Sequence, residues 1–291
     1  MKKRACALLL LLVLCLSLCA CGAVPGAPAD PAEAALTITV FSFEKADAIL
    51  VECGNETMLI DCGERENAPR LLRELKARGI DRLDYLQITH YDKDHVGGAA
   101  TIASALEIGA ILRPDYEGTR TEYISFSHVI ARHPNAAPLS RPESYTLGAA
   151  VFTVYPAEDP SAFDDAADGF DNDMSLVTLL NCGEKRFLFC GDIENARIRQ
   201  MLRSEVDWSC DWIKLPHHGK YGKMLDRLLK SCGAPLAVMT PPAEGAEEKT
   251  RSLLLSLGIE CCEACEEDVV TTLRGGEITV EYRGGKDGET P

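Results

Sequence analysis

Positive charge is scarce in this sequence. The 291 residues contain 30 Lys and Arg against 45 Asp and Glu, which gives a formal net charge of −15. The negative charge is spread along the chain, an arrangement that favours solubility over adhesion to polyanions. No basic stripe follows one segment, so a nucleic-acid partner would need local positive charge or metal ions.

The 13 cysteines have no regular spacing, and this argues against a disulfide scaffold in a chain of this size. Cys261, Cys262 and Cys265 form the one dense cluster. It has no second cysteine or histidine pair nearby, so a zinc knuckle is not favoured. We expect buried free thiols, with one incidental disulfide as the alternative.

The longest hydrophobic run lies at the N-terminus, where a Lys-Lys-Arg start precedes an apolar stretch from Ala5 to Ala20. This is the layout of a signal peptide, and it is short for a membrane-spanning helix. The run ends in Leu18-Cys-Ala-Cys-Gly22, which resembles a bacterial lipobox. We therefore expect residues 1–21 to form a lipoprotein signal peptide with lipidation at Cys21, and an extracytoplasmic, membrane-anchored protein. Plain secretion or a retained anchor are the alternatives.

Residues 22–35 are small residues, prolines and acids without periodicity, and they predict a flexible tether. Residues 36–291 would then form the folded domain. At 46% hydrophobic residues, the sequence can fill a packed core.

Hydrophobic periodicity predicts an α/β fold with strands in both halves and helices between them. Predicted strands are 36–43, 48–52, 57–61, 83–89, 110–113, 150–155, 175–181, 185–190, 212–215, 269–273 and 277–282. Predicted helices are 68–78, 99–106, 122–132, 194–203, 222–231 and 247–257.

The segment from His90 to His95 packs two histidines and two aspartates into six residues and is followed by Gly97-Gly98. A solvated surface loop is the simpler interpretation, because charged residues are usually exposed. Side chains at the end of a strand can instead converge on one point, and imidazoles and carboxylates are common ligands of divalent cations. Such a motif alone can occur by chance.

Two later segments have the same setting. Asp192 follows a predicted buried strand, and His217-His218 follow another, each with a helix next in the chain. Three strand ends that carry metal-type ligands favour a metal site over a charged loop.

These segments resemble those of the metallo-β-lactamase-fold hydrolases, more closely the competence-protein (ComEC) subgroup, and also the related phosphorylcholine esterases. The resemblance runs in the order of the family from Leu36 to Tyr282. It rests on Asp47-Ala-Ile-Leu50, Leu59-Ile-Asp-Cys-Gly63, Thr89 to Gly98, Asn172 to Leu176, Gly191 to Glu194 and Leu215-Pro-His-His-Gly219.

The resemblance implies a four-layer αββα metallo-β-lactamase sandwich with a dinuclear site on one rim. It assigns His90 and Asp92 to the first metal, Asp94 and His95 to the second, Asp192 to both, and His218 to the second. Asp94 and His217 are then the predicted catalytic residues, with His217 donating to the reacting phosphate. Asp61, Asn172, Asp173 and Glu194 are predicted to be hydrogen-bond partners that orient the ligands; for Glu194, a helix cap is equally expected.

The sequence departs from the lactamase-type pattern at two positions. Asp92 stands where that motif has a histidine, and the competence subgroup also carries an aspartate there. Asn172-Asp173 occupies the stretch where many members carry a further histidine for the first site. Oxygen ligands suit Mn²⁺ as well as Zn²⁺, so two divalent ions of either element are expected, and occupancy of the first site stays open.

We therefore expect a lipid-anchored, dinuclear metal-dependent hydrolase, a phosphodiesterase in which the resemblance implies a hydroxide bridging the two ions. Its substrate would be a small phosphoester or a nucleic acid, the membrane would be contacted through the lipid anchor, and no protein partner is predicted. The alternatives are a competence-type nuclease acting on DNA and a non-catalytic binding lipoprotein with a degenerate metal site.

Overall fold

The computed structural model describes residues 35–163 and 169–284. The predicted signal peptide, Cys21 and residues 22–34 of the predicted tether lie outside these ranges, so those assignments stay predictions. Within the described ranges, no helix is long and apolar enough to cross a membrane.

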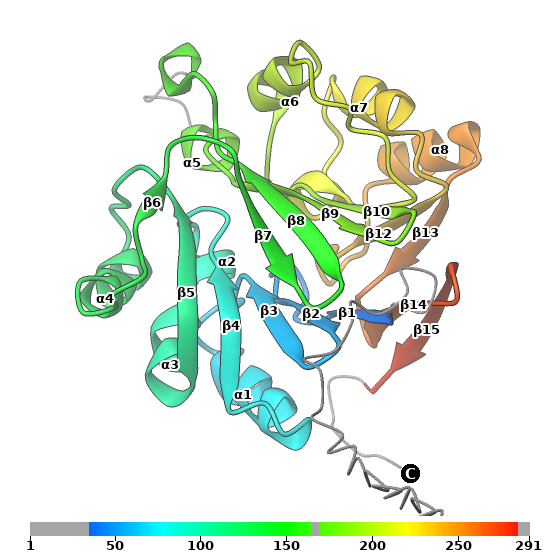
Figure 1. Ribbon diagram of the computed structural model, residues 1–291. Helices are drawn as coiled ribbons and strands as arrows, with labels where there is room; N and C mark the ends of the chain where they lie inside the picture. Colours follow the sequence, from blue (N-terminus) through cyan, green and yellow to red (C-terminus); the bar gives the residue numbers. More distant parts are fainter. Residues whose placement is uncertain (1–34, 164–168, 285–291) are drawn as a thin grey trace, which may run out of the picture.

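Two large β-sheets form the centre of the molecule (Figure 1). The eight-stranded sheet has the order β15-β14-β1-β2-β3-β4-β5-β6, and the seven-stranded sheet has the order β13-β12-β11-β10-β9-β8-β7. The strands of the first sheet are β1 (Leu36–Val40), β2 (Ile49–Cys53), β3 (Glu56–Ile60), β4 (Arg82–Gln87), β5 (Glu107–Pro114), β6 (Pro138–Leu139), β14 (Asp268–Arg274) and β15 (Glu277–Arg283). Those of the second are β7 (Glu143–Leu147), β8 (Ala150–Tyr155), β9 (Val177–Cys182), β10 (Lys185–Phe189), β11 (Trp212–Lys214), β12 (Leu236–Met239) and β13 (Glu260–Glu263).

Helices cover the outer face of each sheet, α1 and α3 on the first and α6, α7 and α8 on the second (Figure 1). The helices are α1 (Ala68–Ala77), α2 (Lys93–Val96), α3 (Ala99–Ala105), α4 (Thr121–Ile130), α5 (Phe170–Asp173), α6 (Asn195–Met201), α7 (Leu225–Cys232) and α8 (Glu248–Leu257), with 3₁₀ turns η2 (Pro160–Ala162) and η3 (Pro216–Gly219). This arrangement confirms the predicted α/β class and the αββα order of layers.

Three buried apolar clusters separate the four layers. One lies between the sheets and includes Val51, Phe152 and Trp212. A second packs the eight-stranded sheet against its helices, and a third does the same for the seven-stranded sheet. Helix α7 illustrates the sequence basis, because its buried residues Leu225, Leu228, Leu229 and Cys232 recur at helical spacing and face the sheet.

The parallel parts of both sheets end on the same rim of the molecule. Strand β4 runs parallel to β3 and β5, and β11 runs parallel to β10 and β12. In α/β sheets, ligands bind beyond the carboxyl ends of such strands. The segments that follow β3, β4, β10 and β11 carry the predicted site residues, so this topology brings them to one rim.

The described cysteines are all free thiols, and most of them are buried. This agrees with the expectation from their irregular spacing. Cys261 and Cys262 lie on β13, next to the apolar core.

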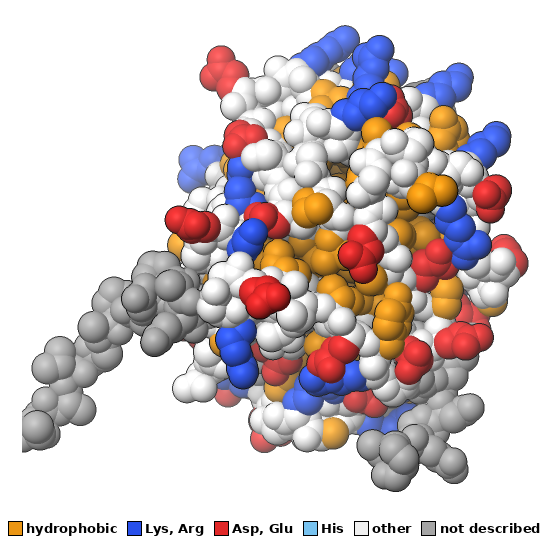
Figure 2. Space-filling model, turned by 90° about the vertical axis from the view of Figure 1, so that its right-hand side faces the viewer, with side chains coloured by type: hydrophobic (Ala, Val, Ile, Leu, Met, Phe, Trp, Pro, Cys, Tyr) orange, Lys and Arg blue, Asp and Glu red, His pale blue; other side chains and the backbone are white. Residues whose placement is uncertain are grey.

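Figure 2 shows the side of the molecule on which α8, β13 and β15 lie. Apolar side chains form a band across its centre, and acidic and basic side chains of the described residues are interspersed around that band. The face drawn there carries no continuous basic stripe over the described residues, in keeping with the charge distribution of the sequence.

Candidate metal centre

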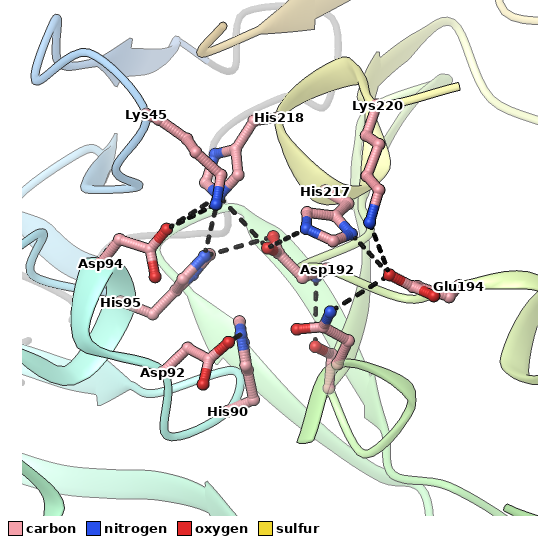
Figure 3. A network of polar contacts seen from close by, with 12 residues as sticks. Lys45, His90, Asp92, Asp94, His95, Asp192, Glu194, His217, His218 and Lys220 are labelled. Atoms are coloured by element: carbon pink, nitrogen blue, oxygen red, sulfur yellow. Dashed lines mark hydrogen bonds and ion pairs between the residues drawn. The ribbon is translucent and has the colours of Figure 1, made fainter. Parts of the chain in front are cut away.

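Four side chains from three separate segments point their donor atoms at one another (Figure 3). The Nε2 atoms of His95 and His218 lie 3.3 Å apart. Asp192 Oδ1 lies 3.2 Å from His95 Nε2, and Asp192 Oδ2 lies 3.2 Å from His218 Nε2. Asp94 Oδ2 completes the group at 3.5 Å from His218 Nε2. Two imidazoles and two carboxylates arranged in this way can hold a divalent cation.

Short elements that follow the strands place these side chains. His95 and Asp94 lie on α2, a single helical turn that begins at Lys93, three residues after His90 in the segment that follows β4. Gly98, directly before α3, has an ordinary φ of −83°. Its role is steric, because a Cβ there would lie 2.4 Å from the carbonyl oxygen of Cys62.

Both histidines of the second segment have left-handed backbone conformations. His217 has φ 49° and His218 has φ 57°, which is a strained state for residues with a Cβ. Gly191, directly before Asp192, also has a positive φ of 55°. Strain of this kind is concentrated at functional sites, where the surrounding structure holds it in place.

Asp61 orients His95 from behind. Its Oδ2 lies 2.7 Å from His95 Nδ1, and its two oxygens accept hydrogen bonds from the backbone N–H and the hydroxyl of Thr89. A carboxylate on the distal nitrogen fixes the ring of a metal-binding histidine and increases its basicity. The geometry is the one expected for the orienting role predicted for Asp61.

Asp47 takes the corresponding position behind His218, and the sequence analysis did not assign it. Its Oδ1 lies 3.4 Å from His218 Nδ1, and Thr240 Oγ1 lies 3.0 Å from the same nitrogen. Lys214 donates to Asp47 Oδ2 at 2.8 Å. One donor atom each from Asp47, His95, Asp192 and His218 lies within 4.8 Å of the others. The motif that begins at Asp47 was part of the family resemblance, and it could have identified Asp47 as a site residue.

Lys214, three residues before His217, is paired with Asp47. The side chain is buried, and its charge is neutralised by Asp47. Lys220, on the other side of the histidine pair, is exposed.

The pKa values of the cluster follow from its alternating charges. Burial alone would lower the pKa of His218, but Asp192 and Asp47 outweigh it and raise that pKa to about 10. Asp192 and Asp61 likewise raise the pKa of His95 well above its ordinary value, against the effect of burial. Burial works to raise the pKa of Asp192, yet His218 and His95 hold it well below the usual range. A divalent ion would take the place of the protons on the two imidazoles.

His90 differs from the other two histidines. It is completely buried, and burial, assisted by the charge of His95, lowers its pKa to about 4. Its Nδ1 lies 3.0 Å from Thr89 Oγ1, while its Nε2 has no hydrogen-bond partner. Asp92 Oδ2 is 3.9 Å from that Nε2. A neutral imidazole whose buried nitrogen has no partner suits a metal ligand.

Asp92 is held by Arg120 from the N-terminus of α4, with Arg120 Nε 2.9 Å from Asp92 Oδ1. No feature of the sequence indicated this pairing. Two buried atoms near the rim, His90 Nε2 and Asn172 Oδ1, have no hydrogen-bond partner. Since buried polar atoms are normally satisfied, these unpartnered atoms fit a site for cations.

His217, Glu194 and Lys220 form a second group next to Asp192 (Figure 3). His217 Nδ1 lies 2.9 Å from Glu194 Oε1, and Lys220 Nζ lies 3.3 Å from the same oxygen. The contact with His217 is the main reason that the pKa of Glu194 falls to about 2. Glu194 is the residue before α6, but its side chain makes no capping hydrogen bond. Its contacts are with His217, Lys220 and Asn172.

Asp173 has a structural contact in place of the predicted orientation of a ligand. Its Oδ1 accepts hydrogen bonds from the backbone N–H groups of Glu194 and Arg197 at 2.7 and 3.2 Å, so it caps the N-terminus of α6. Asn172 donates to Glu194 Oε1 at 3.3 Å and reaches the site through that residue.

Known proteins were compared with this chain by sequence and by structure. The model of the metallo-β-lactamase superfamily matches residues 43–163. ComE operon protein 3 of Bacillus subtilis (strain 168) is 22% identical over 170 residues, which are 58% of this chain and 21% of the relative. The chain therefore spans about a fifth of the length of that relative.

Solved structures share the fold at low sequence identity. YhfI from Bacillus subtilis, a metallo-β-lactamase-fold protein, has a TM-score of 0.55 and 12% identity and covers 86% of this chain and 100% of its own. CmlA, a diiron β-hydroxylase from Streptomyces venezuelae, has a TM-score of 0.51 and 14% identity and covers 83% of this chain and 54% of its own.

The chain thus has the metallo-β-lactamase fold; its residues 43–163 match the model of that superfamily, and part of it is similar to ComE operon protein 3. The fold and the cluster of Asp47, His95, Asp192 and His218 together indicate divalent metal ions.

Proposed function

We propose that the protein is a phosphodiesterase that uses two divalent metal ions. The observation that carries the proposal is the convergence of Asp94, His95, Asp192 and His218, with donor atoms 3.2 to 3.5 Å apart, beside a buried His90 nitrogen that has no partner. The side chains that supply these nitrogen and oxygen donors are buried. Buried donors suit a catalytic pair of ions better than a charge cluster on the surface does.

Bound divalent ions supply water of lowered pKa at neutral pH and stabilise the negative charge that grows on a phosphoryl group. The side chains perform the remaining steps. Asp61 and Asp47 fix the rings of His95 and His218 from behind. His217, oriented by Glu194, holds a proton that it donates to a phosphoryl oxygen or to the leaving group.

The two ion positions differ in the number of donors. The set around His95 and His218 has four side chains, whereas the set around His90 has Asp92 and lacks the further histidine. We therefore expect one tightly bound and one weakly bound ion. The element would be Zn²⁺ or Mn²⁺, and the additional carboxylates suit Mn²⁺, the harder of the two ions.

The proposal includes a lipid anchor at Cys21 and an extracytoplasmic location, which rest on the sequence of residues 1–21. A competence-type nuclease is the second candidate, favoured by the similarity to ComE operon protein 3. A non-catalytic binding lipoprotein is the third, favoured by the missing histidine of the first site.

The test is hydrolysis of bis-p-nitrophenyl phosphate by the purified chain after chelation and after addition of Zn²⁺ or Mn²⁺. We expect turnover only with added metal. Asp94→Asn should abolish turnover, whereas the exposed control Asp226→Asn on α7 should retain it. Turnover that is absent under all metal conditions, with stoichiometric metal bound, would favour the binding lipoprotein.

A further inference from the structure

Two lysines from distant parts of the sequence approach the metal cluster from opposite sides (Figure 3). Lys45 belongs to the connection between β1 and β2, and Lys220 follows η3. Both side chains are about half exposed, at 50% and 54%. In a chain with a net charge of −15, these two ammonium groups bring positive charge to the predicted metal ligands.

Both lysines line one cavity, of about 280 Å³, whose wall includes His217, His218 and Gly219. The rest of the lining is Pro242, Ala246 and Glu247, so Glu247 is its one carboxylate among the described residues. The cavity adjoins the metal cluster through His218. It is close to the small end of the range for ligand pockets, roughly 300 to 1,000 Å³, and has room for a group the size of a sugar phosphate.

The present partners of the lysines are carboxylates of the site itself. Lys45 Nζ lies 3.4 Å from Asp94 Oδ2, and Lys220 Nζ lies 3.3 Å from Glu194 Oε1. A cation bound by Asp94 would compete with Lys45 for that carboxylate. Glu194 Oε1 is shared between His217 and Lys220.

A third feature also favours an anion in this cavity. Helix α8 begins there, with Glu247 as the residue before its first turn and no side-chain capping hydrogen bond. The first N–H groups of a ten-residue helix carry partial positive charge. The start of the helix thus lines the same cavity as the two ammonium groups.

We propose that Lys45 and Lys220 form a clamp for a second phosphate of the substrate, one unit away from the phosphoester that is cleaved. The inference rests on the proposed phosphodiesterase function and narrows its substrate class to esters with an additional phosphate, such as a 5′-phosphorylated dinucleotide. Charge-assisted hydrogen bonds from two separate lysines suit a phosphate as point charges.

The first experiment compares the dinucleotide TpT with its 5′-phosphorylated form pTpT. The wild-type chain should have the higher kcat/KM for pTpT. Lys45→Gln and Lys220→Gln should each reduce that preference by about tenfold, chiefly through KM, because each removes one charge-assisted bond to the additional phosphate. The control Lys230→Gln, an exposed lysine on α7, should keep the wild-type preference.

A second experiment does not depend on turnover. Binding of inorganic pyrophosphate and of orthophosphate to the metal-loaded chain is measured by calorimetry. The double variant Lys45→Gln/Lys220→Gln should lose at least tenfold in affinity for pyrophosphate, and clearly less for orthophosphate, which the metal ions alone can bind. Equal losses for both anions, or no loss, would overturn the clamp.

The outcomes separate the two proposals. If bis-p-nitrophenyl phosphate is cleaved and the preference for pTpT is the same in all variants, the clamp is wrong and the phosphodiesterase stands. If no phosphoester is cleaved, the phosphodiesterase is wrong, and the pyrophosphate measurement alone decides whether the clamp exists.

Discussion

Lys214 and Asp47 form an ion pair, with 2.8 Å between Nζ and Oδ2, that is almost completely shielded from water. Their side chains are 1% and 2% exposed. Lys214 comes from the seven-stranded sheet, and Asp47 from the connection between the first two strands of the eight-stranded sheet. The pair joins the two sheets directly behind His218, which contacts Asp47 through its Nδ1.

Replacement of Lys214 by Met leaves the Asp47 carboxylate buried without its partner. We expect the free energy of unfolding to fall by about 3 to 5 kcal/mol, the usual cost of breaking a buried pair on one side. Urea denaturation measures the change. The double variant Asp47→Asn/Lys214→Met should be more stable than Lys214→Met alone. The control Lys230→Met breaks an exposed pair with Asp226 and should cost at most about 0.5 kcal/mol.

Asp61→Asn keeps the shape of the side chain. It replaces the carboxylate that accepts from His95 Nδ1 by a neutral amide with one acceptor oxygen and one NH₂ donor. Asp61 has a φ of 59°, a conformation that asparagine tolerates, so the fold should be retained. We expect metal affinity to fall by about 10- to 100-fold. Competition with a chelator measures it, and Asp226→Asn is the control. Unchanged affinity would show that Asp61 does not orient a ligand.

Metal binding should release protons near neutral pH. The pKa of His218 is about 10 in the absence of a metal ion, so the ring is protonated at pH 7, and only the neutral ring binds a cation. Affinity should therefore rise with pH towards about 10. Calorimetry of metal binding in two buffers of different ionisation enthalpy counts the protons, and identical heats in both buffers would contradict the protonated state.

Gly98→Ala should strain the segment that carries His95. The added Cβ would lie 2.4 Å from the carbonyl oxygen of Cys62, a backbone atom that cannot move aside easily. We expect a loss of about 1 to 3 kcal/mol in unfolding free energy. The exposed residue Thr101 on α3 offers a control as Thr101→Ala. A loss no greater than that of the control would show that the close approach is relaxed at little cost.

Most elements of the fold could be predicted from the sequence because their hydrophobic patterns are long or regular. The helix predicted at 68–78 is observed as Ala68–Ala77, and the terminal hairpin predicted at 269–273 and 277–282 is observed as Asp268–Arg274 and Glu277–Arg283. Strands β6, β7, β12 and β13 were missed. β12 and β13 have four residues each, too few for periodicity to show, and β13 is polar at both ends.

The site was predictable to the extent that its residues follow strands and match a family pattern. His90, Asp94, His95, Asp192 and His218 are brought together on one rim. The contacts of Arg120 with Asp92 and of Lys214 with Asp47 were not predictable. Each joins residues that are far apart in the sequence, and a lone basic residue carries no local signal of the partner it will find.

The proposed site draws its donors from positions 94, 95, 192 and 218, and Asp47 and Thr240 support the last of them. A nascent chain that has not yet emerged past His218 therefore has no complete set of ligands to offer. The ion must be acquired during or after the docking of both sheets, so the metal supply of the compartment in which the chain folds selects the element alongside the ligands themselves.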